Sequence, residues 1–135
     1  MKENSVPDEK TEKLNLSQQF MRGDVFSDKC PSRDVLKHVT SRWAVLVLLA
    51  LKGGETHRFS ELRRTINGVS EKMLAQTLQQ LEGDGFVKRI VYPVVPPHVE
   101  YQLTPLGIEF GQRVMNLIGW LEDNLSTILD QRQLA

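Results

Sequence analysis

Two short helix-forming segments around the turn signal Asn67-Gly68 constrain the fold more than any other region of the chain. The segment 59–66 before the turn carries apolar residues at helical spacing, and so does the segment 70–82 after it. Ser60 and Ser70 are suitable N-caps because their hydroxyl oxygens can accept hydrogen bonds from the free N–H groups of a first turn. Two short helices joined by a tight turn predict a helix-turn-helix motif.

Two further helices are predicted ahead of this motif. Pro31 suits the first position of a helix, which would place Cys30 at its N-cap. The next helix starts at Thr40 or Ser41 and is apolar on almost all sides over 43–51, a pattern typical of a helix that is buried in the core.

The second half of the chain changes from helical to strand periodicity. The segments 86–92 and 99–103 are rich in Val, Ile, Tyr and Phe and are separated by three prolines, which predicts an antiparallel hairpin; a small edge strand is expected at 56–58. From Thr104-Pro105 onward, apolar residues recur at threes and fours and predict one long amphipathic helix over 105–130. The predicted fold class is mainly α with a small β-hairpin, in the element order of a winged helix-turn-helix.

The N-terminal part of the chain differs from the rest in composition. Residues 1–15 contain few apolar side chains, so we expect a disordered tail followed by one domain over 16–135. Apolar residues between Leu16 and Phe26 are compatible with a short helix. Residues 1–17 also lack the apolar stretch of a secretory signal. The longest apolar run in the chain, Trp43–Leu51, is too short to span a bilayer. These features predict a cytoplasmic protein with no membrane segment.

The charge of the chain is balanced as a whole and uneven along its length. There are 17 basic and 17 acidic residues in total, which argues against a strongly basic, nonspecific nucleic-acid coat. Residues 30–104, however, carry 10 basic and 7 acidic side chains. The predicted helix-turn-helix therefore lies in the most basic part of the chain.

The second helix of the motif has two chemically different faces. Leu74, Leu78 and Leu81 form one apolar stripe, whereas the opposite face offers an ammonium group and several amides that can reach phosphates or base edges. Outward Lys and Gln residues are common on any surface helix, but serines and arginines at the neighbouring helix starts add candidate phosphate contacts. The predicted DNA contacts on the two helices are Ser60, Arg63, Arg64, Ser70, Lys72, Met73, Gln76, Gln79 and Gln80.

The hairpin is a second candidate DNA-binding element. Lys88, Arg89 and His98 flank an apolar, proline-stiffened tip over 94–97. We expect these three side chains to contact the DNA backbone or the minor groove. Alternation along a strand also sends some charged side chains to solvent without any such role.

Several separate stretches of the chain, in the same order, closely resemble the HxlR-type transcriptional regulators. These stretches are Cys30-Pro31, Ser41-Arg42-Trp43, Arg58–Arg63, Ser70–Leu74, Leu78, Leu81-Glu82, Gly85–Val87 and Val99–Gly107. The similarity extends from about Cys30 to the C-terminus. It implies a homodimeric winged helix protein with N- and C-terminal dimerisation helices that binds double-stranded operator DNA, usually near its own gene. We predict a repressor, although the sequence itself does not distinguish repression from activation.

The terminal helix supports a dimer independently. It has more apolar positions than packing against one small domain needs, and a two-fold axis through it predicts a palindromic operator. A helix buried entirely within its own domain is the alternative. The candidate dimerisation residues are Phe20, Phe110, Val114, Leu117, Leu121 and Leu125.

Cys30 is a candidate redox-sensing residue. The resemblance implies that it matches a cysteine through which some family members sense oxidants, quinones or aldehydes. A helix N-terminus and the adjacent Lys29 and Arg33 favour the reactive thiolate, whereas Asp28 and Asp34 oppose it. An inert, buried thiol is the alternative. With one cysteine in the chain, no internal disulfide can form, so any disulfide must join two subunits or include a small thiol.

The sequence offers no support for enzymatic or metal chemistry. His38, His57 and His98 lack partners at metal-ligand spacing, and there is no Gly-rich phosphate loop or nucleophile elbow. We therefore predict no metal, no cofactor and no enzymatic activity, and the sequence specifies no small-molecule effector. The remaining alternative is a winged helix that binds another protein, which salt dependence would distinguish because DNA affinity falls steeply with salt.

Overall fold

The computed structural model describes residues 24–134 and divides into two compact units, of which the first ends at Thr40 and the second begins at Ser41. Each unit is described separately below. The predicted tail over 1–15 and the candidate dimer residue Phe20 lie outside the described residues, as does the part of the predicted short helix before residue 24.

The first unit contains the helix α2 (Pro31–Val39), which begins as the sequence predicts. Cys30 is the N-cap, and Pro31 occupies the first turn. The helical pattern expected to run to Phe26 does not reach that residue, since the chain from Asp24 forms turns in which the Ser27 N–H donates to the Asp24 carbonyl at 2.9 Å. Arg33 reaches back to the same segment, because its Nη1 donates to the Phe26 carbonyl at 2.7 Å.

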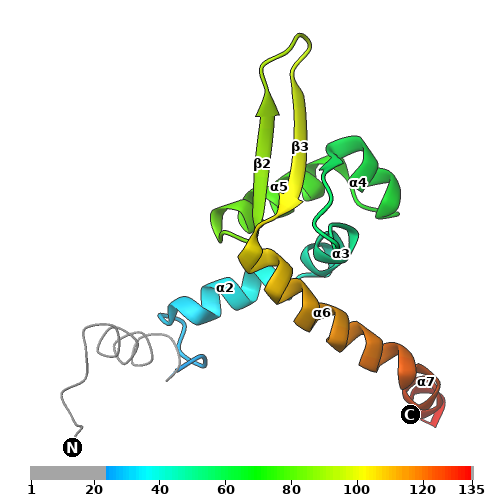
Figure 1. Cartoon of the computed structure of the whole chain (residues 1–135). Helices are drawn as coiled ribbons and strands as arrows, with labels where there is room; N and C mark the ends of the chain where they lie inside the picture. The colour runs from blue at the N-terminus through cyan, green and yellow to red at the C-terminus, as the bar shows by residue number, and fades with distance from the viewer. Residues whose placement is uncertain (1–23, 135) are drawn as a thin grey trace, which may run out of the picture. The chain divides into compact units, whose positions relative to one another are not determined.

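The core of the second unit is formed by three helices, α3 (Arg42–Ala50), α4 (Phe59–Thr65) and α5 (Glu71–Gly83) (Figure 1). Ser41 caps α3 by accepting a hydrogen bond from the Ala44 N–H at 3.2 Å. Leucines from all three helices are fully buried, which confirms α3 as the central helix and the stripe predicted on α5. The largest of these buried side chains are Leu48, Leu51, Leu62, Leu74, Leu78 and Leu81.

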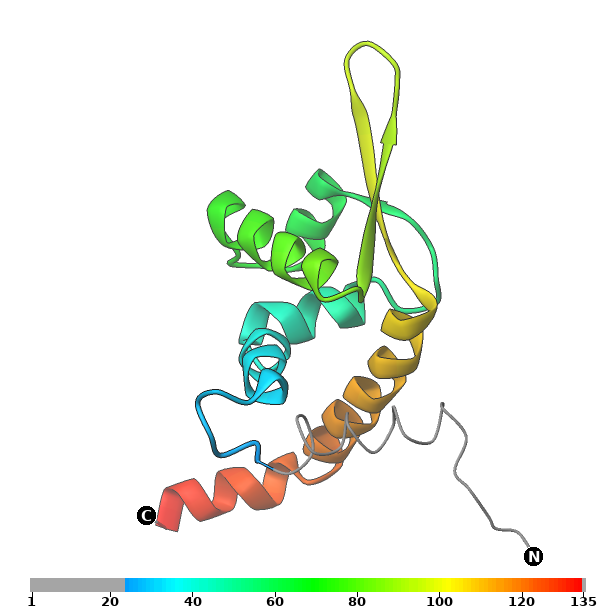
Figure 2. The ribbon, with the colours of Figure 1, turned by 90° about the vertical axis from the view of Figure 1, so that its left-hand side faces the viewer.

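The sheet is antiparallel and has the strand order β1-β3-β2, with β1 (His57–Arg58), β2 (Val87–Tyr92) and β3 (His98–Leu103). Strands β2 and β3 form the predicted hairpin, which projects beyond α4 and α5 as the wing (Figures 1 and 2). Its tip is exposed, and the Val95 side chain at the turn is 99% exposed. The winged helix-turn-helix architecture is therefore confirmed.

The helix α6 (Pro105–Asp123) starts at a hydrogen-bonded junction with the turn between α5 and β2. The Thr104 hydroxyl donates to the Gly85 carbonyl at 2.6 Å and accepts from the Gly107 N–H at 3.0 Å. The Thr104 N–H donates to the Phe86 carbonyl at 3.0 Å. Gly107 is required here because any Cβ at this position would collide with the Phe86 backbone.

The single helix predicted over 105–130 is wrong, because the chain forms α6 and then a separate helix, α7 (Leu125–Leu134). The break lies at Asn124, whose backbone leaves the helical region with φ −109° and ψ 9°. The Trp120 carbonyl accepts hydrogen bonds from both the side-chain amide of Asn124, at 2.9 Å, and its backbone N–H, at 3.1 Å. No helix in the described part of the chain is long and apolar enough to cross a membrane.

Candidate DNA-binding surface

Helix α5 is fixed by its N-cap and by its buried face. The Ser70 hydroxyl accepts from the Met73 N–H at 3.1 Å, as the sequence predicts. Thr77 lies on the buried face with the leucines, and its hydroxyl is satisfied by donating to the Met73 carbonyl at 2.7 Å. The helix therefore cannot rotate without exposing its leucines.

The opposite face of α5 presents the side chains that the sequence singled out. Lys72, Gln76 and Gln79 are exposed, Met73 is partly exposed beside them, and Gln80 is half-buried. One ammonium group and several amides on an exposed, rigid helix can donate to and accept from base edges in a major groove.

Helix α4 begins two residues earlier than the sequence suggests. Arg58 is the N-cap residue, and the Glu61 carboxylate accepts from its N–H at 2.7 Å. The prediction that Ser60 caps this helix is therefore wrong, because Ser60 lies inside the first turn. Its side chain is exposed there, as are those of Arg63 and Arg64.

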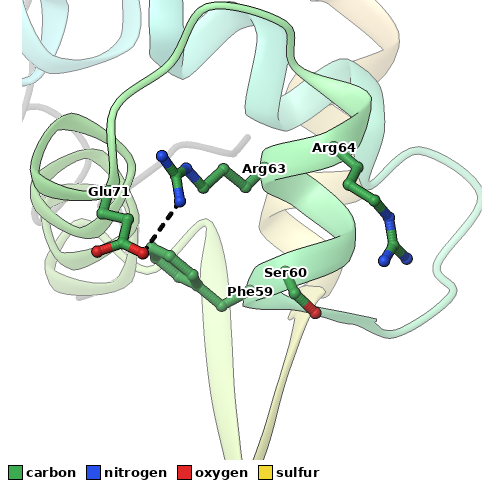
Figure 3. A pocket seen from close by; sticks show the side chains of 5 residues that line it. All are labelled: Phe59, Ser60, Arg63, Arg64 and Glu71. Carbon is green, nitrogen blue, oxygen red and sulfur yellow. Dashed lines mark hydrogen bonds and ion pairs between the residues drawn. The ribbon is translucent and has the colours of Figure 1, made fainter.

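A surface pocket of about 380 Å³ lies between α4 and the start of α5 (Figure 3). The residues that line it are Phe59, Ser60, Arg63, Arg64 and Glu71. Arg63 and Glu71 point toward one another across the pocket, with Arg63 Nη1 donating to Glu71 Oε1 at 3.0 Å (Figure 3). The pocket brings together three predicted DNA contacts and adds Glu71, which sequence reasoning missed because the pair spans the turn rather than one helix.

The structure separates the predicted contacts of the wing. Lys88 pairs with Gln102 and Arg89 with Tyr101, so the two cations lie on opposite faces of the hairpin. Arg89 shares a pocket with Gln79 and Glu82, which places it beside α5. Lys88 lies on the face that also carries His98 and Glu100.

His98 belongs to a polar cluster near the tip of the wing. Its Nε2 lies 2.6 Å from Glu100 Oε2, and its ring meets the Tyr92 ring edge-on with the centroids 5.1 Å apart. Hydrogen bonds from His98 and then from Thr56 lower the pKa of the Glu100 carboxyl below its ordinary value. The negative charge of Glu100 in turn raises the pKa of the Tyr92 phenol. His98 is thus held by Glu100 rather than extended freely into solvent.

The predicted dimerisation residues fall into two groups. Phe110 stacks on Phe86 with the ring centroids 5.0 Å apart, and Val114 is buried, so both already contribute to packing within the protomer. Leu117, Leu121 and Leu125 are exposed. Sequence reasoning missed Trp120, which is 59% exposed, together with the exposed Met115 and Leu129.

The Cys30 thiol is buried at the N-cap of α2. Desolvation acts to raise its pKa, but hydrogen bonds from the Ser32 side chain and from the backbone of Ser32 and Arg33 outweigh this and lower the pKa below its ordinary value. These hydrogen bonds stabilise the thiolate, whereas the burial of the side chain agrees with the alternative of an inert thiol. Within residues 24–134, no group of three or more His, Cys, Asp or Glu side chains is arranged to hold a metal ion.

Comparison with known proteins agrees with this arrangement of helices and wing. Residues 38–128 match the HxlR-like helix-turn-helix family. The chain is 63% identical over 119 residues to the uncharacterised HTH-type transcriptional regulator YtfH of Escherichia coli (strain K12), an alignment that covers 88% of this chain and 94% of that protein.

Two solved structures extend the comparison to three dimensions. The transcriptional regulator YtfH from Salmonella typhimurium has a TM-score of 0.76 and 63% identity, covering 82% of this chain and 98% of that one. The redox regulator HypR in its reduced form has a TM-score of 0.68 and 33% identity, covering 74% of this chain and 98% of that one. The chain belongs to the HxlR-like helix-turn-helix family of transcriptional regulators.

Proposed function

We propose that this protein acts in the cytoplasm as a homodimeric repressor that inserts one α5 helix from each subunit into successive major grooves of a palindromic operator. The observation that carries the proposal is the exposed polar face of α5, which is held outward by the buried leucines on the opposite face. A rigid helix with one buried apolar face and one exposed polar face is suited to contacting base edges directly.

The residues around α5 divide into two roles in this proposal. Lys72, Gln76 and Gln79 face the bases, whereas Arg63 and Arg64 on α4 lie where the helix that precedes a recognition helix crosses the DNA backbone. Phosphate contacts would set the position of the protein on the duplex, and base contacts would select the sequence.

The exposed apolar side chains of α6 and α7 support the dimer. Leu117, Trp120, Leu121, Leu125 and Leu129 are all partly or largely exposed on two consecutive helices. A second copy of the chain would bury them across a two-fold axis, and the same axis would relate two operator half-sites about 34 Å apart.

A gel-shift titration at two salt concentrations tests DNA binding, with the DNA upstream of the protein's own gene as the probe. We expect a specific shift whose affinity falls steeply with salt, because bound counterions are released from the DNA. Lys72→Ala should weaken binding, whereas Lys52→Ala, which removes an exposed lysine that follows α3, should not. No shift at low salt beyond that seen with random DNA would favour the alternative of a protein-binding module.

We also propose that the Cys30 thiolate senses oxidants or electrophiles, and that its modification changes DNA affinity. The lowered pKa at the helix N-cap supports this role, and the similarity to the redox regulator HypR agrees with it. The same titration with and without a quinone tests it. The wild type should respond and Cys30→Ser should not, and an equal response from both proteins would contradict the proposal.

A further inference from the structure

Glu71 is an acidic side chain on a surface that is otherwise suited to DNA. It occupies the first position of α5 directly after the Ser70 cap, and its side chain is 72% exposed. Its neighbours in the pocket include Ser60, Arg63 and Arg64, which are the proposed phosphate contacts. A carboxylate here lies where DNA phosphates would approach, and two negative charges in proximity repel each other.

Stability gives this carboxylate only a small role, because a negative charge in the first turn of a helix interacts favourably with the helix dipole. The Arg63–Glu71 ion pair has a 3.0 Å contact, but the two side chains are 46% and 72% exposed. Ion pairs this exposed to water contribute little to folding. The pair does have one clear consequence, which is that it occupies the guanidinium that would otherwise be available for a phosphate.

The location of Glu71 also brings it within reach of bases. The N-terminal residues of a recognition helix are those that contact base edges. A carboxylate only accepts hydrogen bonds, and the cytosine N4 amino group is the donor that Asp and Glu read in the major groove. In the free protein the Glu71 carboxylate accepts a hydrogen bond from Arg63 Nη1 at 3.0 Å.

We infer that Glu71 is a specificity-determining residue, which accepts a hydrogen bond from a cytosine amino group in the operator and disfavours DNA that lacks a cytosine at that position. On other sequences the Glu71 carboxylate remains paired with Arg63 beside the phosphates and keeps that guanidinium from them. Discrimination of this kind uses repulsion against the wrong site as well as attraction to the right one. The inference rests on the DNA binding proposed above.

The test uses Glu71→Gln in the full chain and Glu109→Gln as its matched control. Glu109 also forms an exposed ion pair, with Arg113 at 3.6 Å, but it lies on α6 rather than on α5. Each protein selects sites from a random duplex library. Its affinity is then measured for the site that the wild type selects and for a mixed-sequence duplex, over a range of salt concentrations.

We expect Glu71→Gln to bind the mixed-sequence duplex more tightly and to lower the ratio of specific to nonspecific affinity by about tenfold, the scale of one base contact. The salt dependence on mixed DNA should become steeper by about one phosphate contact as Arg63 is released. The variant should also lose the preference for cytosine at one symmetric position. The Glu109→Gln control should match the wild type.

Two results would overturn the inference. One is a ratio of specific to nonspecific affinity for Glu71→Gln that stays within about twofold of the ratio for Glu109→Gln. The other is that Glu71→Gln selects the same base as the wild type at every position of the operator. Failure of the proposed function itself would look different, because the wild type would then show no salt-dependent DNA binding and would select no site.

Discussion

Helix α5 and the C-terminal helices α6 and α7 present opposite chemistry to solvent. On α5 the leucines are buried and the exposed face is polar, whereas on α6 beyond Val114 and on α7 the exposed face includes Leu117, Trp120 and Leu129. All three segments have apolar residues at helical spacing in the sequence. The difference arises from what each helix packs against, and it distinguishes a surface suited to water or DNA from one suited to another protein surface.

The largest expected effect comes from placing negatively charged side chains on the exposed apolar face of α6. Leu117→Glu combined with Trp120→Glu should weaken dimerisation by about 4 kcal/mol, on the basis of about 2 kcal/mol for each central interface side chain. Analytical ultracentrifugation at micromolar concentration should then detect a monomer. Gln112→Glu adds one negative charge at an exposed polar position of α6 and should leave the assembly intact. A double variant that sediments like the wild type would rule out this surface as the interface.

A buried position of α5 should give the next largest effect. Leu78→Ala removes a fully buried side chain and should lower the free energy of unfolding by about 3 kcal/mol. Denaturant unfolding followed by circular dichroism measures this change. A loss below 1 kcal/mol would mean that α5 is less firmly packed than its burial indicates.

A substitution on the exposed face of the same helix should reduce DNA affinity and leave the free energy of unfolding almost unchanged. Gln76→Ala should change the free energy of unfolding by no more than about 0.5 kcal/mol, because the side chain is exposed. Operator affinity should fall by about 1–3 kcal/mol if Gln76 contacts a base. Fluorescence anisotropy with the selected operator gives the affinity, and an unchanged value would remove Gln76 from the interface.

The polar cluster of the wing should contribute the smallest effect, and its sign follows from Glu100. Because the folded state lowers the pKa of this carboxyl below its ordinary value, ionised Glu100 stabilises the fold at pH values above that ordinary pKa. The contribution is lost as the pH falls through the lowered pKa. Unfolding measured between pH 6 and 3 should therefore depend less on pH in Glu100→Gln than in the wild type. An exposed control, Glu55→Gln, should retain the full dependence.

The order of elements could be predicted from the sequence because most helix starts carry a local sequence signal. Pro31, Ser41, Ser70 and Thr104 are found at the helix starts where their chemistry places them. The start of α4 was predicted wrongly because a backbone N–H bonded to Glu61 replaces a serine cap, and an arginine gives no such signal.

Features that depend on contacts between elements could not be predicted. The break at Asn124 interrupts a continuous apolar pattern without Gly or Pro, so periodicity alone extends the helix through it. The Arg63–Glu71 pair joins two helices across a turn, and the packing of Phe110 on Phe86 joins a helix to a strand start. Sequence spacing identifies which side chains share a face, but not which of those faces meet.

The junction of Thr104 and Gly107 with the turn at Gly85 fixes the direction in which α6 leaves the winged domain. In the proposed dimer, α6 carries the two-fold axis, so its direction determines how far apart the two recognition helices lie. The length of the operator spacer would then depend on residues that contact neither DNA nor the second subunit. Relatives with the same α5 but a different junction would select the same half-site sequence at a different spacing.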